Sequence, residues 1–74
     1  MKDIEIISEY ITLGKFLKHI NLISSGGESK IFIINNKIII NKNKNKIVTR
    51  GVKLFPGDII FINNESFKIV NENL

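Results

Sequence analysis

Basic side chains concentrate in the middle of this 74-residue chain, which carries a formal net charge of +4. Residues 31–53 hold six lysine or arginine residues and no acidic residue, whereas residues 1–10 and 54–74 are each net negative. Cations clustered in this way attract polyanions, above all phosphate groups. The pattern therefore predicts one electropositive face. An AT-rich genome would also enrich asparagine and lysine, and this alternative stays open for the Asn-Lys run at 41–46.

The spacing of individual cations suits phosphate contacts. Lys15 and Lys18 are three residues apart, so they project from neighbouring positions if the segment is helical. Arg50 and Lys53 flank Gly51, and an arginine can hold one phosphate through two hydrogen bonds while a lysine adds a point charge. A merely solvated edge is the alternative interpretation of this second pair.

Patterns typical of enzymes are absent from the sequence. The chain contains no cysteine, which removes thiolate chemistry and cysteine-ligated metal sites. His19 is the sole histidine and has no second ligand at metal-binding spacing, so we expect no catalytic residue, no metal, no other cofactor and no small-molecule substrate. No apolar run reaches the roughly 18 residues of a membrane span and no signal peptide is recognisable, so a cytoplasmic protein is expected.

Hydrophobic periodicity predicts the elements of the first half. Residues 4–7 form a β-branched run typical of a strand. Thr12 is a candidate N-cap for a helix whose buried face has the i, i+3, i+4, i+7 spacing, formed by Leu13, Phe16, Leu17 and Ile20. The exposed face of the same helix is then expected to carry Gly14, Lys15, Lys18 and His19.

Ser25 and Glu28 have the spacing of a capping box, which predicts the start of a second helix. The next apolar residues, 31–34, are β-branched and aromatic and favour a strand, so the residues alone leave this segment undecided. Asn35 and Asn36 predict a stop, because asparagine tolerates the left-handed conformation that ends helices.

Gly26 and Gly27 lie between the two predicted helices and allow two interpretations. They form a tight turn, or they leave the first backbone N–H groups of the second helix open to a phosphate oxygen.

The second half is predicted to be mainly β-structure. Its segments, in order, are a strand at 37–41, a solvated loop at 41–46, a short strand at 47–49, a type II turn at 55–58, a hairpin of strands 59–62 and 66–70, and a frayed tail at 71–74. The phenylalanines lie in apolar runs and are expected in the core. Tyr10 and Phe55 are the aromatic residues expected to be partly exposed.

This order of elements resembles the S-four-type RNA-binding domain, also called the alpha-L motif, over residues 10–62. The segments 11–18, 25–27 and 50–54, with Gly57-Asp58 after them, are similar to those of short stand-alone bacterial members. The resemblance implies an α+β fold in which two helices pack on a small, curved, mostly antiparallel sheet, with residues 31–34 helical. We expect one domain over residues 1–74, with strands 4–7 and 66–70 flanking the core.

The resemblance also implies that both helix starts face RNA. The expected ligand is structured RNA, ribosomal RNA or a ribosome assembly intermediate, bound by phosphate and shape contacts. The alternative, from a different class, is a protein-interaction module that docks an acidic partner such as a replication or repair protein. Residues 11–13 depart from the Arg-Leu-Asp of many members, so site specificity does not carry over. The candidate RNA-binding residues are Thr12, Lys15, Lys18, Ser25, Gly26, Gly27, Lys30, Lys37, Arg50 and Lys53.

Overall fold

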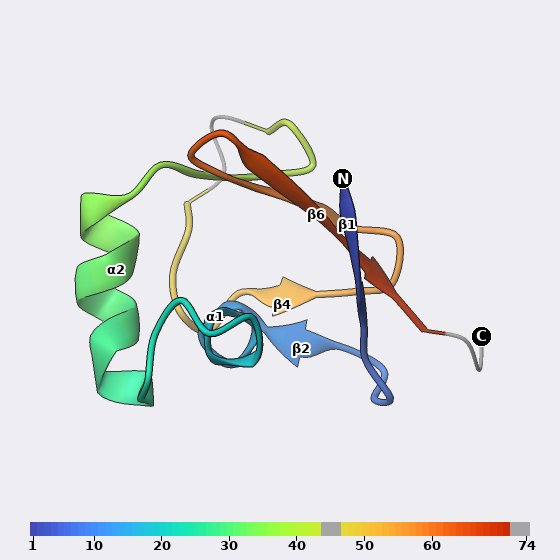
Figure 1. The fold of residues 1–74 in the computed structure, drawn as a ribbon, viewed down its shortest axis with the longest axis horizontal. Helices are drawn as coiled ribbons and strands as arrows, with labels where there is room; N and C mark the ends of the chain where they lie inside the picture. Colours follow the sequence, from blue (N-terminus) through green and yellow to red (C-terminus); the bar gives the residue numbers. More distant parts are fainter. Residues whose placement is uncertain (44–46, 72–74) are drawn as a thin grey trace.

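The computed structural model describes residues 1–43 and 47–71, and it places a four-stranded sheet over a layer formed by one helix and a short pair of strands (Figure 1). A second helix stands at one side of both layers (Figure 1). The elements in chain order are β1 (Lys2–Glu5), β2 (Ile11–Thr12), α1 (Leu13–His19), the 3-10 helix η1 (Gly26–Glu28), α2 (Ser29–Asn35), β3 (Ile38–Ile40), β4 (Lys53–Leu54), β5 (Ile59–Ile62) and β6 (Glu65–Val70). This arrangement confirms the predicted α+β class.

The larger sheet has the strand order β1-β6-β5-β3. Strand β5 is antiparallel to both of its neighbours, whereas β1 runs parallel to β6, so the sheet is mixed and mostly antiparallel. Asn63 and Asn64 connect β5 to β6, and Asn63 has φ 55°, the left-handed conformation that tight hairpin turns require. The predicted hairpin is confirmed.

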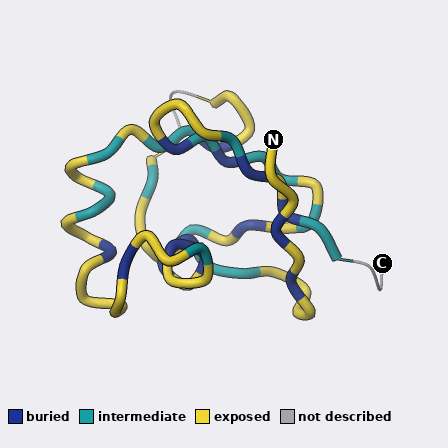
Figure 2. The backbone as a smooth tube through the Cα atoms, viewed as in Figure 1, coloured by how far each residue is buried: buried dark blue, intermediate teal, exposed yellow. Residues whose placement is uncertain are grey.

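The core lies between the sheet and α1, and the buried residues occur in both layers (Figure 2). Leu13, Phe16 and Leu17 have no exposed surface, as the helical spacing predicted. The edge of the Phe16 ring meets Phe67 of β6 at a centroid distance of 5.7 Å. Each such side chain stabilises the fold by about 1.5–3 kcal/mol, so α1 is held mainly by this apolar face.

Residues 31–34, for which the sequence left strand and helix open, are helical and belong to α2. The capping box of Ser25 and Glu28 starts the helical turn at η1. Phe32 and Ile33 then pack against the core and give the helix a buried side. Local capping and tertiary packing together override the β-propensity of the run.

The stop after α2 occurs at the predicted residues but by a different conformation. The helix ends at Asn35, and Asn36 is extended, with φ −132°, rather than left-handed. The Asn36 side chain donates a hydrogen bond from Nδ2 to the Phe32 carbonyl oxygen at 2.9 Å. This bond satisfies a carbonyl of the last turn and stabilises the helix end without positive φ.

The strand predicted at 47–49 is wrong. These residues run from the sheet layer down to the layer of α1 without pairing to another strand (Figure 1). Val48 packs against the core, whereas Ile47 is 82% exposed. Propensity alone does not make a strand where no edge lies alongside. The strand that follows in the chain, β4, is paired, and its antiparallel partner is β2.

The first strand begins earlier than the predicted residues 4–7. Its parallel register with β6 pairs Lys2 with Phe67 and Glu5 with Val70, and the Ile6 N–H still donates to the Val70 carbonyl at 2.9 Å. Ile7 lies beyond this ladder and is 89% exposed. The register with β6 therefore sets the strand ends.

The turn at 55–58 is confirmed. Gly57 has φ 95°, and the Asp58 N–H donates to the Phe55 carbonyl at 2.9 Å. The Asp58 carboxylate in turn accepts the Phe55 N–H at 2.8 Å. This closed turn fixes Phe55 directly after β4.

Two predictions fall partly outside the described residues. In the solvated loop at 41–46, Asn41 and Lys42 have left-handed φ values of 53° and 60°, and residues 44–46 are not described. In the tail at 71–74, Asn71 donates a hydrogen bond to the Ser8 carbonyl at 3.0 Å, so the frayed tail does not begin at this residue. Residues 72–74 are not described.

Candidate nucleic-acid interface

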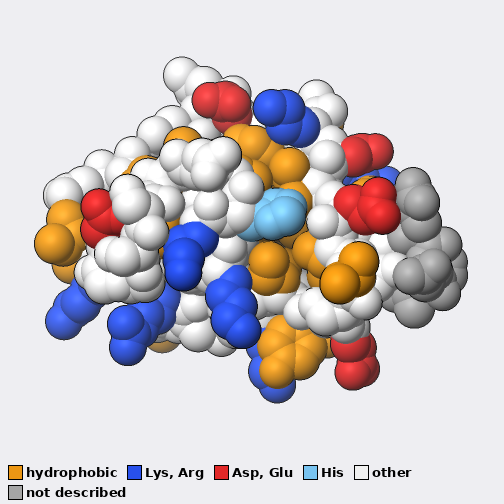
Figure 3. Space-filling model, turned by 60° about the horizontal axis from the view of Figure 1, so that its bottom comes forward, with side chains coloured by type: hydrophobic (Ala, Val, Ile, Leu, Met, Phe, Trp, Pro, Cys, Tyr) orange, Lys and Arg blue, Asp and Glu red, His pale blue; other side chains and the backbone are white. Residues whose placement is uncertain are grey.

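A shallow groove of about 360 Å³ lies between α1, η1 and the chain at residues 50–51, and we call it the basic groove. Figure 3 shows lysine and arginine side chains gathered on the face of the molecule that carries α1. The groove brings together segments that are far apart in the sequence. Its lining residues are Thr12, Gly14, Lys15, Lys18, Gly26, Ser29, Arg50 and Gly51.

Gly14 makes this groove possible because it lets the backbone at residue 50 approach α1. The N–H groups of Leu13 and Gly14 donate to the carbonyls of Val52 and Arg50 at 2.8 and 2.9 Å. A β-carbon at Gly14 would lie 3.2 Å from Ser29 Oγ and 3.4 Å from the Arg50 carbonyl oxygen. The prediction that Gly14 lies on the exposed face of the helix is therefore wrong, since it is buried.

The same hydrogen bonds change the expected role of Thr12. It occupies the N-cap position of α1, but its side chain makes no capping hydrogen bond. The carbonyls of Val52 and Arg50 already satisfy the N–H groups at this helix start. These N–H groups are not available to RNA, and the Thr12 hydroxyl is free to bind a ligand instead.

Gly26 and Gly27 differ from Gly14 in that the fold does not require them. Among the glycines only Gly57 has positive φ, so no left-handed turn explains this pair. A β-carbon at Gly26 would meet nothing within 4 Å, and one at Gly27 would meet only Ser25 Oγ, at 4.0 Å. The backbone of η1 is therefore open toward the groove.

Glu28 fixes the segment that leads into η1. Its carboxylate accepts the backbone N–H groups of Ser24 and of Ser25, the latter at 3.0 Å. These two hydrogen bonds, with that of Ser24 the stronger influence, hold the pKa of Glu28 below its ordinary value. The Glu28 carboxylate therefore forms its hydrogen bonds within its own segment of the chain. These bonds fix Ser25 at the start of η1.

Ser29 is a groove residue that the sequence did not indicate. It is only 1% exposed, and its Oγ has no hydrogen-bond partner among the residues that the structure describes. Its small side chain fits against Gly14, where a larger one would push α1 and the start of α2 apart. No local pattern predicts this contact, because the two residues belong to different helices.

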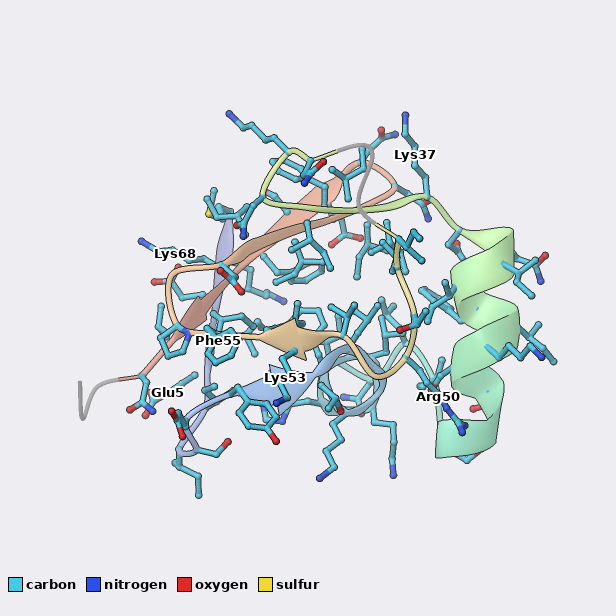
Figure 4. All side chains as sticks on the ribbon, turned by 180° about the vertical axis from the view of Figure 1, so that it is seen from behind. Glu5, Lys37, Arg50, Lys53, Phe55 and Lys68 are labelled. Carbon is cyan, nitrogen blue, oxygen red and sulfur yellow. The ribbon has the colours of Figure 1, made fainter. Side chains whose placement is uncertain are left out.

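Five predicted residues lie outside the groove lining: Ser25 and Gly27, which adjoin the lining residue Gly26 in the chain, and three lysines. Lys30 lies on the other side of Arg50, where both line a separate pocket with residues of α2. Lys53 pairs with Thr12 across β2 and β4, and its Nζ lies 4.8 Å from the centre of the Tyr10 ring. Lys37 lies at the opposite end of the molecule from Arg50 and Lys53 (Figure 4). The structure thus brings all the predicted residues except Lys37 to one side.

Other site chemistries find little support in the part of the chain that is described. No group of three or more histidine or acidic side chains in residues 1–43 and 47–71 is arranged to hold a metal ion. Among the same residues, no helix has both the length and the apolar composition needed to cross a lipid bilayer.

Comparisons with known proteins agree with this geometry. The S4 domain family matches residues 4–70. A curated relative from Bacillus subtilis (strain 168), named "Probable ribosome maturation protein RlbA", is 41% identical over 69 residues, which cover 92% of this chain and 94% of the relative. No solved structure is significantly similar to the chain. The match over nearly the whole length shows that the chain belongs to the S4 domain family.

Proposed function

We propose that this protein binds structured RNA without catalysing a reaction, and that its ligand is ribosomal RNA or a ribosome assembly intermediate. The observation that carries the proposal is the basic groove, in which cations from α1 and from the chain at residue 50 converge beside an open glycine backbone. The proposed contact residues are Thr12, Lys15, Lys18, Ser25, Gly26, Gly27, Lys30, Arg50 and Lys53. We leave Lys37 out of the proposed contacts because it lies at the opposite end of the molecule from Arg50 and Lys53.

The cations supply the affinity in this proposal. Lys15 and Lys18 line the groove from one side of α1, and Arg50 faces them from the crossing segment. RNA phosphates that enter the groove would meet all three, and each neutralised phosphate releases bound counterions. The planar guanidinium of Arg50 can hold two phosphate oxygens at once, whereas the lysines act as point charges.

The glycine step supplies the close approach. The first N–H groups of a helical segment have no acceptor within the segment, so those of η1 can donate to a ligand. Without side chains at Gly26 and Gly27, a phosphate oxygen reaches this backbone directly. The contact depends on the shape of the RNA backbone and not on base identity, which suits recognition of folded RNA.

The family membership and the curated relative support the ribosomal part of the proposal. The relative from Bacillus subtilis is named as a probable ribosome maturation protein, and it aligns with this chain over nearly its whole length. A small domain with a basic groove and, among the described residues, no cluster of metal-ligating side chains suits a factor that binds and stabilises an RNA fold.

The test is ultraviolet crosslinking in cells, followed by sequencing of the RNA attached to the protein. We expect the crosslinked fragments to map to structured regions of ribosomal RNA. A matched sample with Lys15, Lys18 and Arg50 changed to alanine should lose these fragments. If the complexes resist nuclease and contain protein only, the domain docks an acidic protein partner and the proposal is wrong.

A further inference from the structure

A second pocket, of about 510 Å³, adjoins the basic groove, and we call it the Tyr10 pocket. Thr12 and Lys15 line both cavities, so an RNA strand in the groove passes the mouth of this pocket. Its volume falls within the range of small-ligand sites. The residues that line it are Ser8, Glu9, Tyr10, Ile11, Thr12 and Lys15.

The aromatic wall of this pocket is exposed to solvent. Tyr10 is 37% exposed and Phe55 43%, whereas Phe16 and Phe67 are buried in the core. Phe55 does not line the pocket, but its ring centre lies 5.7 Å from that of Tyr10, with a 45° angle between the ring planes, so it packs beside the Tyr10 ring from outside. Exposed aromatic rings beside cations are the usual means by which proteins stack single-stranded bases.

Lysines surround this aromatic surface. Lys53 places its Nζ over one face of the Tyr10 ring, 4.8 Å from the ring centre, so the opposite face is the one available for stacking. Lys15 lies at the boundary with the basic groove. A base that stacks on Tyr10 would therefore have the Lys53 cation across the ring and Lys15 on the side of the groove.

The remaining polar groups of the pocket accept hydrogen bonds. The Glu9 side chain is exposed, and its carboxylate repels phosphate but accepts amino and imino N–H groups of bases. The Ser8 hydroxyl already donates to the Tyr10 carbonyl at 2.8 Å, which leaves its oxygen as an acceptor. Such a lining suits the base of a nucleotide and not its phosphate.

We infer that the Tyr10 pocket binds one unpaired RNA base, which stacks on the Tyr10 ring and donates an N–H group to the Glu9 carboxylate. The inference rests on the proposed function and adds base recognition to a groove that otherwise selects RNA by shape. A fully paired stem would fill the basic groove and leave this pocket empty.

Tyr10 provides its own probe, because the chain contains one tyrosine and no tryptophan. Three RNA hairpins with the same stem are compared: one with a single bulged adenine, one fully paired, and one with an abasic site at the bulge. We expect the bulged adenine to quench the tyrosine fluorescence and to bind about 5- to 30-fold more tightly than the paired stem. The abasic hairpin should lose both effects.

Two variants sharpen the assignment. Tyr10→Leu keeps an apolar side chain, so it should bind the paired stem like the wild type but lose the preference for the bulge. Glu9→Gln should keep the fluorescence quenching but bind the bulged hairpin less tightly, because a neutral amide oxygen is a weaker acceptor than a carboxylate. Equal affinity for all three hairpins, with unquenched fluorescence, would overturn the inference and leave the proposed function intact. Failure to bind any of the hairpins would contradict both.

Discussion

Glycine serves different purposes at the two helix starts of this domain. At α1, Gly14 is buried, and a β-carbon there would lie 3.2 Å from Ser29 Oγ and 3.4 Å from the Arg50 carbonyl oxygen. At η1, neither Gly26 nor Gly27 has positive φ, and added β-carbons would meet no atom closer than 4.0 Å. Packing explains the first glycine but not the other two, which we propose contact RNA.

Gly14 is thus needed to build the groove, whereas Gly26 and Gly27 are proposed to contact the ligand. Gly14 holds the crossing segment against α1, so its loss should damage the fold and carry the groove with it. Gly26 and Gly27 contribute nothing to packing, so their replacement should leave the fold intact. Stability and RNA affinity measured on the same variants can therefore test the comparison.

The largest expected effect is that of Gly14→Val. The branched side chain would enter the contact with Ser29 and the Arg50 backbone, and such overpacking costs about 1–3 kcal/mol of unfolding free energy. Denaturant unfolding followed by circular dichroism measures this loss. The matched control is Gly26→Val, where the same side chain meets open space and should change stability by less than about 1 kcal/mol. Equal losses at both sites would remove the distinction between the two glycine types.

The next effect is on RNA affinity. Arg50→Ala should weaken binding to a folded RNA by about tenfold, because it removes a cation that faces Lys15 and Lys18 across the groove. Its melting temperature should hardly change, since exposed charges contribute little to folding. Lys37→Ala removes the same charge at the opposite end of the molecule and should leave affinity nearly unchanged. Equal losses for the two variants would show a response to net charge alone.

A smaller pair of effects, opposite in sign, is expected at Gly27. Alanine is the better helix former by about 1 kcal/mol, and its methyl group has room in the fold, so Gly27→Ala should raise stability. The same methyl group would stand between the backbone of η1 and a phosphate, so RNA affinity should fall several-fold. Thermal unfolding and RNA titration on one preparation measure both. If stability rises and RNA affinity stays unchanged, the backbone of η1 does not contact the phosphate, and binding depends on the cations alone.

The smallest expected effect concerns the pH dependence of the η1 start. The hydrogen bonds from Ser24 and Ser25 lower the pKa of Glu28 in the folded chain, so the ionised carboxylate stabilises the fold above its ordinary pKa. That stabilisation is lost as the pH falls through the lowered value. Glu28→Gln should therefore be slightly less stable than the wild type at neutral pH. The two proteins should converge in acid, and a constant difference down to pH of about 2 would contradict this account.

Local patterns in the sequence predicted the features that depend on neighbouring residues. The stripe of Leu13, Phe16 and Leu17 predicted α1, and the capping box predicted where the second helical turn begins. The turn around Gly57 was equally clear, because its conformation needs a residue without a side chain.

Most of the missed features depend on contacts between distant segments. The pairing of β2 with β4, the unpaired path of residues 47–49 and the burial of Gly14 each require the chain near residue 50 to lie against α1. Ser29 was missed for the same reason, since its neighbour Gly14 belongs to another helix. A periodicity of 2 or 3.6 residues describes a single strand or helix and gives no information on contacts between distant elements.

The most direct test of the RNA-binding groove is nuclear magnetic resonance of the backbone amides during titration with a folded ribosomal RNA fragment. The account predicts that the largest shifts occur at Gly26 and Gly27 and at the amides near Lys15, Lys18 and Arg50, and that added salt reverses them with a log-affinity slope of about −2 to −5. The amides near Lys37 should hardly move. Shifts confined to the Lys37 end, or an affinity that does not respond to salt, would contradict the account.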